Sequence, residues 1–215
     1  MSSVLTIGDH RGRDAAFFKQ KLGCYTVASD LNATTLQLVK INGWVDDVAA
    51  IDVEKIDFLS ESFDFVIGKE CFHHFPRPML GLYEMLRVAK HGVILLEPND
   101  TSTSLGSYID SDSYHDSYEE VGNYVYRISL REMIKAAWSL YLPFVVAIGF
   151  NDPYKDGIKF EEWMREKDHL DSMIDSNLRA PNLMTIAILK NPMHDLSGLN
   201  ERYRVYKRPL SIFES

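Results

Sequence analysis

Short apolar runs alternate with helix-like segments along this chain. Apolar runs at 4–7, 25–29, 47–53, 63–67, 93–96, 144–149 and 184–189 predict seven strands, and the segments between them predict helices at 13–22, 33–41, 78–89, 129–140 and 160–175. Apolar runs of this length that are separated by helices indicate a sheet buried on both faces. The pattern therefore predicts an α/β, Rossmann-like, doubly wound fold with a seven-stranded, mostly parallel sheet and helices on both faces.

Local signals place the ends of several elements. His91-Gly92 is expected to end the helix that Pro78 opens, because glycine favours a helix C-terminus and proline its first turn. Ser129, followed three residues later by Glu132, is the capping-box pattern that starts a helix. A basic cluster near the end of the chain is interpreted as a solvated tail. It comprises Arg202, Arg204, Lys207 and Arg208.

The length of 215 residues predicts a single domain, 1–215, with two interruptions of the regular pattern. The stretch at about 99–127 begins with residues rich in Ser, Asp and Tyr and has no hydrophobic period there, and the stretch at about 155–180 carries an inserted helix. Both are longer than ordinary connections. We expect them to be loop or lid insertions on the substrate side of the domain.

Composition and charge exclude several classes of protein. No apolar run is long enough to cross a bilayer and no basic segment precedes an apolar run at the N-terminus, so we expect a cytoplasmic protein with no membrane span. The net charge of −8 disfavours a nucleic-acid partner. Two cysteines cannot form a disulfide scaffold, and without a Cys-x-x-Cys pattern no structural metal site is expected. Cys71 is interpreted as a small buried residue, the alternative being a catalytic thiol.

Candidate binding residues follow the predicted strands, since a doubly wound sheet binds its ligands at the carboxyl ends of its strands. The first strand ends at Gly8-Asp9-His10-Arg11-Gly12, a turn in which backbone N–H groups can approach a ligand. Asp30 ends the second strand 22 residues later (30 minus 8), near the spacing of about 20 at which an acid binds ribose hydroxyls. Asp52 ends the third strand. Each of these acids has an alternative interpretation as a cap or a surface turn.

The strongest motif runs through the third, fourth and fifth strands. It reads DVEKIDF at 52–58 and SFDFVIGKECFHHFP at 62–76, and continues as LYEMLRV at 82–88 and GVILLEP at 92–98. Together with the strand ends above, it resembles the class I S-adenosylmethionine-dependent methyltransferases, and within them the type 11-like group with a histidine pair after the fourth strand. The resemblance covers about residues 4–100 by motif and the chain to about 190 by strand order. It implies S-adenosylmethionine as the cofactor and methyl transfer as the reaction.

The resemblance also implies which residues line the cofactor: the glycine turn along its methionine part, Asp30 at the ribose, Asp52 at the adenine and Lys69 near the sulfonium. The full set is Gly8, His10, Gly12, Asp30, Leu31, Asp52, Val53, Gly68 and Lys69. Two residues depart from the family pattern, because Thr6 stands where the family usually has an acid and His10 where it has a glycine. The His10 side chain either crowds the cofactor's carboxylate or donates to it.

Methyl transfer to an alcohol requires positioning and a base that removes the alcohol's proton. His73 and His74 follow the fourth strand and Glu97 ends the fifth, so these three are the catalytic candidates; the alternative is that the histidine pair is structural. Mixed aromatic and polar groups suit a polyhydroxyl acceptor, or else merely pack a long loop. The acceptor candidates are Tyr118, Asn123, Tyr126, Arg127 and Asn151.

These observations lead to one main hypothesis and two alternatives. The main one is O-methylation of a small polar molecule, such as a sugar in a surface-polysaccharide pathway, by a chain that is free to form a homo-oligomer. The second is a non-catalytic, methyltransferase-like binding or assembly subunit, motivated by Thr6 and His10. The third is a nicotinamide-dependent dehydrogenase, which would share the glycine turn and the acid but usually has a glycine at position 10.

Overall fold

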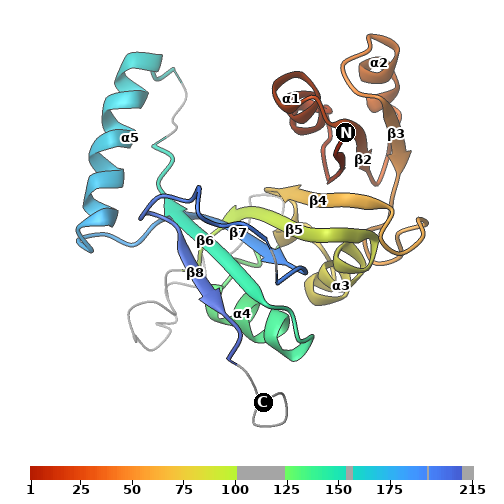
Figure 1. Ribbon diagram of the computed structural model, residues 1–215. Coiled ribbons are helices and arrows are strands. Elements are labelled where there is room, and N and C mark those ends of the chain that lie inside the picture. The colour runs from red at the N-terminus through yellow and green to blue at the C-terminus, as the bar shows by residue number, and fades with distance from the viewer. Residues whose placement is uncertain (101–123, 154–156, 193, 210–215) are drawn as a thin grey trace.

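The computed structural model describes residues 1–100, 124–153, 157–192 and 194–209, and its centre is one twisted sheet (Figure 1). The strand order is β3-β2-β1-β4-β5-β7-β6-β8. The strands are β1 Ser3–Ile7, β2 Tyr25–Asp30, β3 Asp47–Ala50, β4 Phe63–Lys69, β5 Ala89–Pro98, β6 Phe144–Phe150, β7 Leu183–Leu189 and β8 Arg204–Lys207. Strands β1 to β5 pair in parallel, whereas β7 is antiparallel to both β5 and β6.

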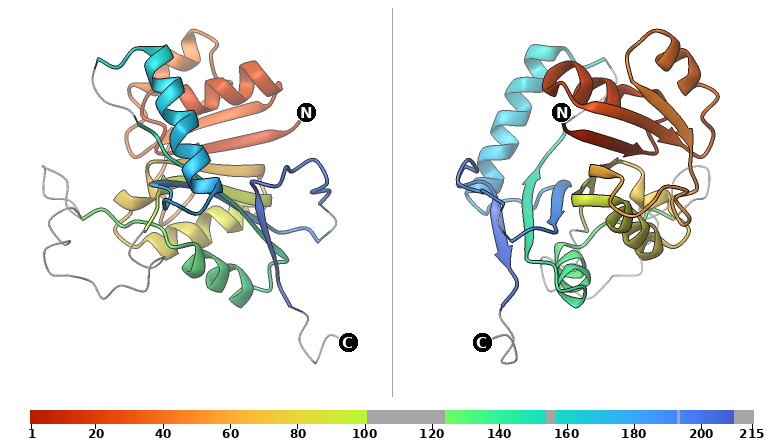
Figure 2. Two further views of the ribbon diagram at one scale, coloured as in Figure 1. Left: turned by 90° about the vertical axis from the view of Figure 1, so that its left-hand side faces the viewer. Right: turned by 45° about the vertical axis from the view of Figure 1, so that its right-hand side comes forward.

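Helices cover both faces of this sheet, as predicted. They are α1 Arg13–Leu22, α2 Leu36–Ile41, α3 Pro78–Val88, α4 Leu130–Ser139 and α5 Phe160–Asp175, with a short 3₁₀ turn η1 at Phe72–His74. Figures 1 and 2 show α3 and α4 on one side of the sheet and α1, α2 and α5 on the other. The predicted α/β architecture is therefore confirmed. No helix in the part of the chain that the structure describes is long and apolar enough to cross a membrane.

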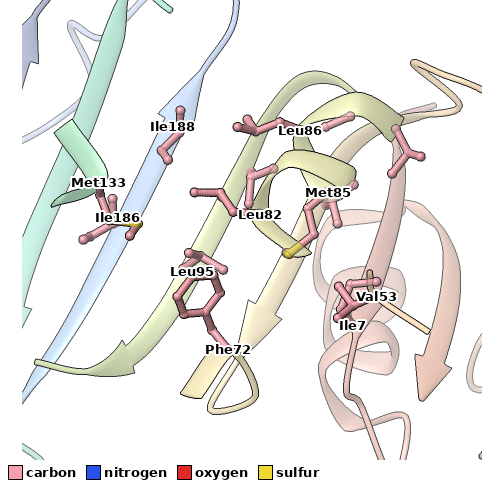
Figure 3. Packing of buried hydrophobic residues seen from close by; sticks show 14 of the residues in the cluster. Ile7, Val53, Phe72, Leu82, Met85, Leu86, Leu95, Met133, Ile186 and Ile188 are labelled. Carbon is pink, nitrogen blue, oxygen red and sulfur yellow. The ribbon is translucent and has the colours of Figure 1, made fainter. Parts of the chain in front are cut away.

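The main hydrophobic core lies between the sheet and the helices α3 and α4 (Figure 3). Helix α3 presents Leu82, Met85 and Leu86 to it, because residues at i, i+3 and i+4 share one face of a helix. Leu95 of β5 and Ile186 of β7 complete the contact from the sheet, and both are fully buried. Full burial of each such side chain contributes about 1.5–3 kcal/mol, so this layer fixes the strands whose ends carry the candidate site.

The structure corrects the predicted end of α3. The helix stops at Val88, and β5 begins directly at Ala89, so His91 and Gly92 lie inside a strand and do not terminate a helix. A Cβ at Gly92 would lie 2.5 Å from the carbonyl oxygen of Ile188 on the neighbouring strand β7. The glycine therefore permits a close approach of two strands, which a single sequence cannot distinguish from a helix end.

The basic cluster near the C-terminus is also corrected. Arg204 and Lys207 belong to β8, an eighth strand that pairs antiparallel with β6 and was interpreted as a solvated tail. Tyr206 packs against the main core from this strand, and the ammonium of Lys207 lies 6.0 Å from the ring centroid of Phe144. A short edge strand with charged side chains is a common end to a sheet, because those charges oppose further pairing.

Candidate active site

The ends of β1 and β4 meet at the carboxyl edge of the sheet. Gly8, directly after β1, adopts φ 66°, and a Cβ built on it would lie 2.5 Å from the Cβ of Cys71 in the turn after β4. Gly12, with φ 64°, is the N-cap of α1, and a Cβ there would lie 2.9 Å from a methyl carbon of Val39 in α2. Both glycines are thus required by conformation and by space. Cys71 is buried, as predicted, and burial raises the pKa of its thiol well above the ordinary value.

A carboxylate that the sequence interpretation overlooked stabilises this turn. Asp9 is buried, and its oxygens accept from the backbone N–H groups of Ala15 at 2.9 Å and Asp14 at 3.3 Å, in the first turn of α1. The hydroxyl of Thr6 donates to the same carboxylate at 3.0 Å. Asp9 therefore provides an acceptor for the free N–H groups in the first turn of α1 and places a negative charge at the positive end of the helix dipole. An acid beside the first glycine was the available signal for it.

The next two strand ends expose their acids at the same edge. Asp30 ends β2 half-buried, and the only hydrogen bond of its carboxylate among the described residues is a long one, 3.3 Å, from the backbone N–H of Asn32. Asp52 is exposed and accepts from the backbone N–H of Glu54, whereas Val53 is buried in the main core. Leu31 is exposed. The three acids therefore differ: the Asp9 carboxylate accepts hydrogen bonds from three protein groups, whereas those of Asp30 and Asp52 each accept one.

The His10 side chain is exposed, so it does not fill the interior of the glycine turn. Its backbone carbonyl accepts from the hydroxyl of Thr35 at 2.9 Å, which ties the turn to the start of α2. The departure from glycine at this position is therefore compatible with the local fold.

Lys69, the last residue of β4, faces two carboxylates. Its ammonium lies 3.4 Å from Glu70 and 4.0 Å from Asp14 of α1. Burial, and then the neighbouring Asp9 carboxylate, raise the pKa of Asp14 above its ordinary value. Glu70 adopts φ 49°, a left-handed conformation that costs a residue with a Cβ about 1–2 kcal/mol. Backbone strain of this kind concentrates at functional sites. Gly68, two residues earlier, is buried within β4.

Glu97 at the end of β5 holds the turn that carries the histidine pair. One of its oxygens accepts from the backbone N–H groups of Cys71 and Phe72, each at 2.9 Å, and the other lies 2.6 Å from Nδ1 of His73. Glu97 is fully buried and His73 is nearly so. The rings of His73 and His74 have centroids 4.1 Å apart. The structure therefore brings the three catalytic candidates together.

A pocket of about 310 Å³ opens beside this histidine pair. Its lining is His73, His74, Phe75, Pro76, Pro78, Tyr124 and Tyr126. The hydroxyl of Tyr126 lies 3.3 Å from a carboxylate oxygen of Glu132, to which it donates, and burial, followed by the charge of Glu132, raises the pKa of Tyr126 to about 12. Tyr126 is thus a neutral donor at neutral pH and no base.

The other acceptor candidates are not gathered in this pocket. Tyr118 and Asn123 lie outside the described residues. Arg127 is half-buried next to the pocket-lining segment but is not part of the lining. Asn151 is buried at the end of β6, where its side-chain oxygen accepts from the backbone N–H of Asn182. Among the described residues, no group of three or more His, Cys, Asp or Glu side chains is arranged to hold a metal ion.

Comparison with known proteins points to one family. Residues 5–96 match the model of a family described as a methyltransferase domain. Over this part the chain carries a methyltransferase domain, in agreement with the predicted resemblance to class I S-adenosylmethionine-dependent methyltransferases. The predicted recognition, enzyme class and cofactor are thereby confirmed for this methyltransferase.

Solved structures show the same fold. One is an S-adenosylmethionine-dependent methyltransferase from Thermotoga maritima, with 15% identity and a TM-score of 0.59 over 89% of this chain and 83% of that chain. Another is an S-adenosylmethionine-dependent methyltransferase from Archaeoglobus fulgidus, with 16% identity and a TM-score of 0.60 over 88% of this chain and 86% of that chain. A third is the Haloferax volcanii methyltransferase in complex with the Trm112 activator, with 15% identity and a TM-score of 0.61 over 90% of this chain and 84% of that chain. No match was found among curated protein sequences. At these identities the likeness establishes the fold of this methyltransferase and leaves its acceptor open.

Proposed function

We propose that this methyltransferase transfers the methyl group of S-adenosylmethionine to a hydroxyl of a small polar acceptor, a sugar or a related polyhydroxyl metabolite such as a precursor of a surface polysaccharide. The observation that carries the proposal is the pairing of His73 with Glu97 in the wall of an aromatic pocket. Aromatic rings can pack on the apolar faces of a sugar while imidazole and phenol groups bind its hydroxyls. Among the residues that the structure describes, the pocket's lining contains no carboxylate that could pair with an amine acceptor.

The residues at the carboxyl edge fit the cofactor's chemistry. Gly8 and Gly12 leave the backbone of the first turn open where a Cβ would clash, with His10 on its exposed side. The carboxylate of Asp30 is free to accept from a ribose diol. Asp52 and Leu31 are exposed and would bind the adenine, while Val53 and Gly68 are buried behind them at the same edge. When bound, the cofactor supplies the sulfonium methyl.

In this proposal His73 is the base and Glu97 a positioning residue. Because both oxygens of Glu97 are already engaged, it orients the imidazole through Nδ1 and takes no proton from the acceptor. The second ring nitrogen, Nε2, would take the proton of the acceptor hydroxyl; the cofactor would supply the methyl group to that oxygen and leave as S-adenosylhomocysteine. His74 and Tyr126, which line the pocket, would bind the remaining hydroxyls. Tyr118, Asn123, Arg127 and Asn151 stay acceptor candidates of the sequence prediction.

The test is to offer the enzyme a panel of hexoses and nucleotide-linked sugars and to measure methyl transfer as the release of S-adenosylhomocysteine. His73→Asn should lower kcat by about 100-fold or more, the usual contribution of a general base, without changing the affinity for S-adenosylmethionine. His91→Asn is the matched control, because this half-exposed imidazole lies at the start of β5, away from the pocket. Full kcat in the His73→Asn enzyme would refute the assignment.

The alternative, a non-catalytic binding subunit, has one structural observation behind it. Thr6 replaces the family's usual acid, and its hydroxyl lies 3.0 Å from the Asp9 carboxylate and 3.5 Å from the carbonyl oxygen of Val27. Under this alternative the chain would turn over no acceptor in any panel. Binding of S-adenosylmethionine with ordinary affinity would count against it.

A further inference from the structure

A second, larger cavity lies at the other end of the sheet. It has a volume of about 600 Å³ and is formed where the C-terminal end of α5, the loop before β7, and β8 come together over β6 (Figures 1 and 2). We call it the arginine pocket. Its lining is Leu130, Ala147, Gly149, Ile174, Asp175, Asn177, Arg179, Ala180, Pro181, Met184, Glu201, Arg202, Arg204 and Tyr206. None of these residues belongs to the cofactor edge or to the histidine pocket.

Strand register explains how charged and apolar groups come to share this cavity. Arg204 pairs with Ala147 in the antiparallel ladder between β8 and β6, and paired residues present their side chains to the same face. Ala147 points into the main core, so Arg204 and, two residues on, Tyr206 lie on the core side of the sheet edge. Met184 and Leu130 supply further apolar surface. The pocket therefore has an apolar floor and a cationic rim.

The charges at the rim fall into two groups. Arg202 is engaged, because Nε donates to Asp175 at 3.1 Å and Nη2 lies 3.4 Å from the buried carboxylate of Asp171. By contrast, the guanidinium groups of Arg179 and Arg204 have no hydrogen bond or ion pair with any residue that the structure describes. Glu201 is likewise unpaired within the described part of the chain, so the unmatched charges of the rim sum to one positive charge (two arginines minus one glutamate).

Two unmatched arginines are notable on a chain whose net charge is −8. Guanidinium groups bind phosphate and carboxylate through two parallel N–H donors, which an ammonium cannot reproduce. We propose that the arginine pocket is a binding site for a small organic anion, in which Arg179 and Arg204 hold a phosphate or carboxylate group and the floor at Ala147, Leu130 and Met184 takes an apolar body. This site is additional to the methyl-transfer site.

Phenyl phosphate is a direct probe, because it combines a dianionic head with an apolar ring. We expect saturable binding in calorimetric titration, weaker binding of inorganic phosphate and of benzoate, and none of phenol. Arg179→Gln and Arg204→Gln should each weaken the binding of phenyl phosphate roughly tenfold, because each removes one charge-assisted hydrogen bond. Arg204→Lys should recover only part of that loss. The matched control is Arg165→Gln, an exposed arginine of α5 outside the lining, which should change nothing.

Other results would overturn the proposal. Equal binding of phenol and phenyl phosphate would show that the pocket does not recognise an anionic group. Unchanged affinity in both glutamine variants would show that the ligand binds elsewhere. Absence of saturable binding by every probe would also overturn it. Arg179 and Arg204 are exposed, so both variants should unfold at the temperature of the parent protein, and circular dichroism melting confirms that any loss of binding is local. Titration with S-adenosylmethionine should be unaffected in both.

Discussion

Gly8→Ala tests whether the ends of β1 and β4 form one rigid site. The substitution places a Cβ in a backbone conformation of φ 66° and 2.5 Å from the Cβ of Cys71, a separation that real Cβ contacts essentially never show. The turn carrying His73 must then move away from the glycine turn, or the glycine turn must open. Either movement alters the edge at which the cofactor is proposed to bind.

The cost can be worked from two contributions. A residue with a Cβ in the left-handed region loses about 1–2 kcal/mol, and overpacking against a buried neighbour costs about 1–3 kcal/mol. Together they predict a loss of roughly 2–5 kcal/mol in the free energy of unfolding. A domain of this size shifts its Tm by about 2–4 °C for each kcal/mol, so the expected decrease is on the order of 4–20 °C. The affinity for S-adenosylmethionine should fall at least tenfold, since it depends on the displaced turn.

Gly23→Ala is the matched control for this prediction. Gly23 has φ 64°, almost the same as Gly8, but a Cβ built there meets no atom within 4 Å. The Gly23→Ala variant should therefore lose only about 1–2 kcal/mol of the free energy of unfolding, from the backbone conformation, and keep its affinity for the cofactor. Urea denaturation gives the two free energies and calorimetry the two affinities. Equal losses in both variants would refute the close contact between Gly8 and Cys71.

Three further predictions concern buried or paired carboxylates. Asp9→Asn should cost about 1–3 kcal/mol in urea denaturation, because the start of α1 loses its charged acceptor, and an unchanged midpoint would contradict the cap. The pKa of Asp64 is lowered, first of all by the hydrogen bond from the backbone N–H of Ser3. Its contribution to the free energy of unfolding is therefore present above the ordinary carboxyl pKa and is lost as the pH falls through the lowered pKa. Asp64→Asn should accordingly cost about 1–2 kcal/mol near pH 7 and almost nothing near pH 2, and equal costs at both would be inconsistent with it. Asp171→Asn should speed amide hydrogen exchange in α5 and leave β4 and β5 protected, since Lys167 at 2.6 Å and Arg202 lose their shared partner.

The sequence predicted the sheet well because its signal is local. Each of the seven expected strands is present, since an apolar run of four to seven residues between helices has few other uses in an α/β chain. The histidine pair and Glu97 could be located because they follow strand ends, and parallel strands bring their carboxyl ends to one edge. The meeting of Gly8 with Cys71 follows from the same geometry, but its closeness does not.

What could not be predicted depends on partners that are distant in the chain. The four residues of β8 carry two basic side chains, but the strand pairs with β6 and Tyr206 packs against the main core. The third strand was expected within 47–53 with its end near Asp52, whereas β3 ends at Ala50, and Ile51 and Val53 bury their side chains in the main core after the strand. Apolar character predicts burial in such cases without specifying the element.

The most direct test of the account is calorimetric titration of the protein with S-adenosylmethionine and S-adenosylhomocysteine, with NAD as the control ligand. The account predicts micromolar binding of the first two, no binding of NAD, and a loss of about 1–3 kcal/mol in the Asp30→Ala variant, where the ribose diol loses its acceptor. No binding of either adenosyl compound would contradict the methyltransferase site, and unchanged affinity in the variant would remove Asp30 from it.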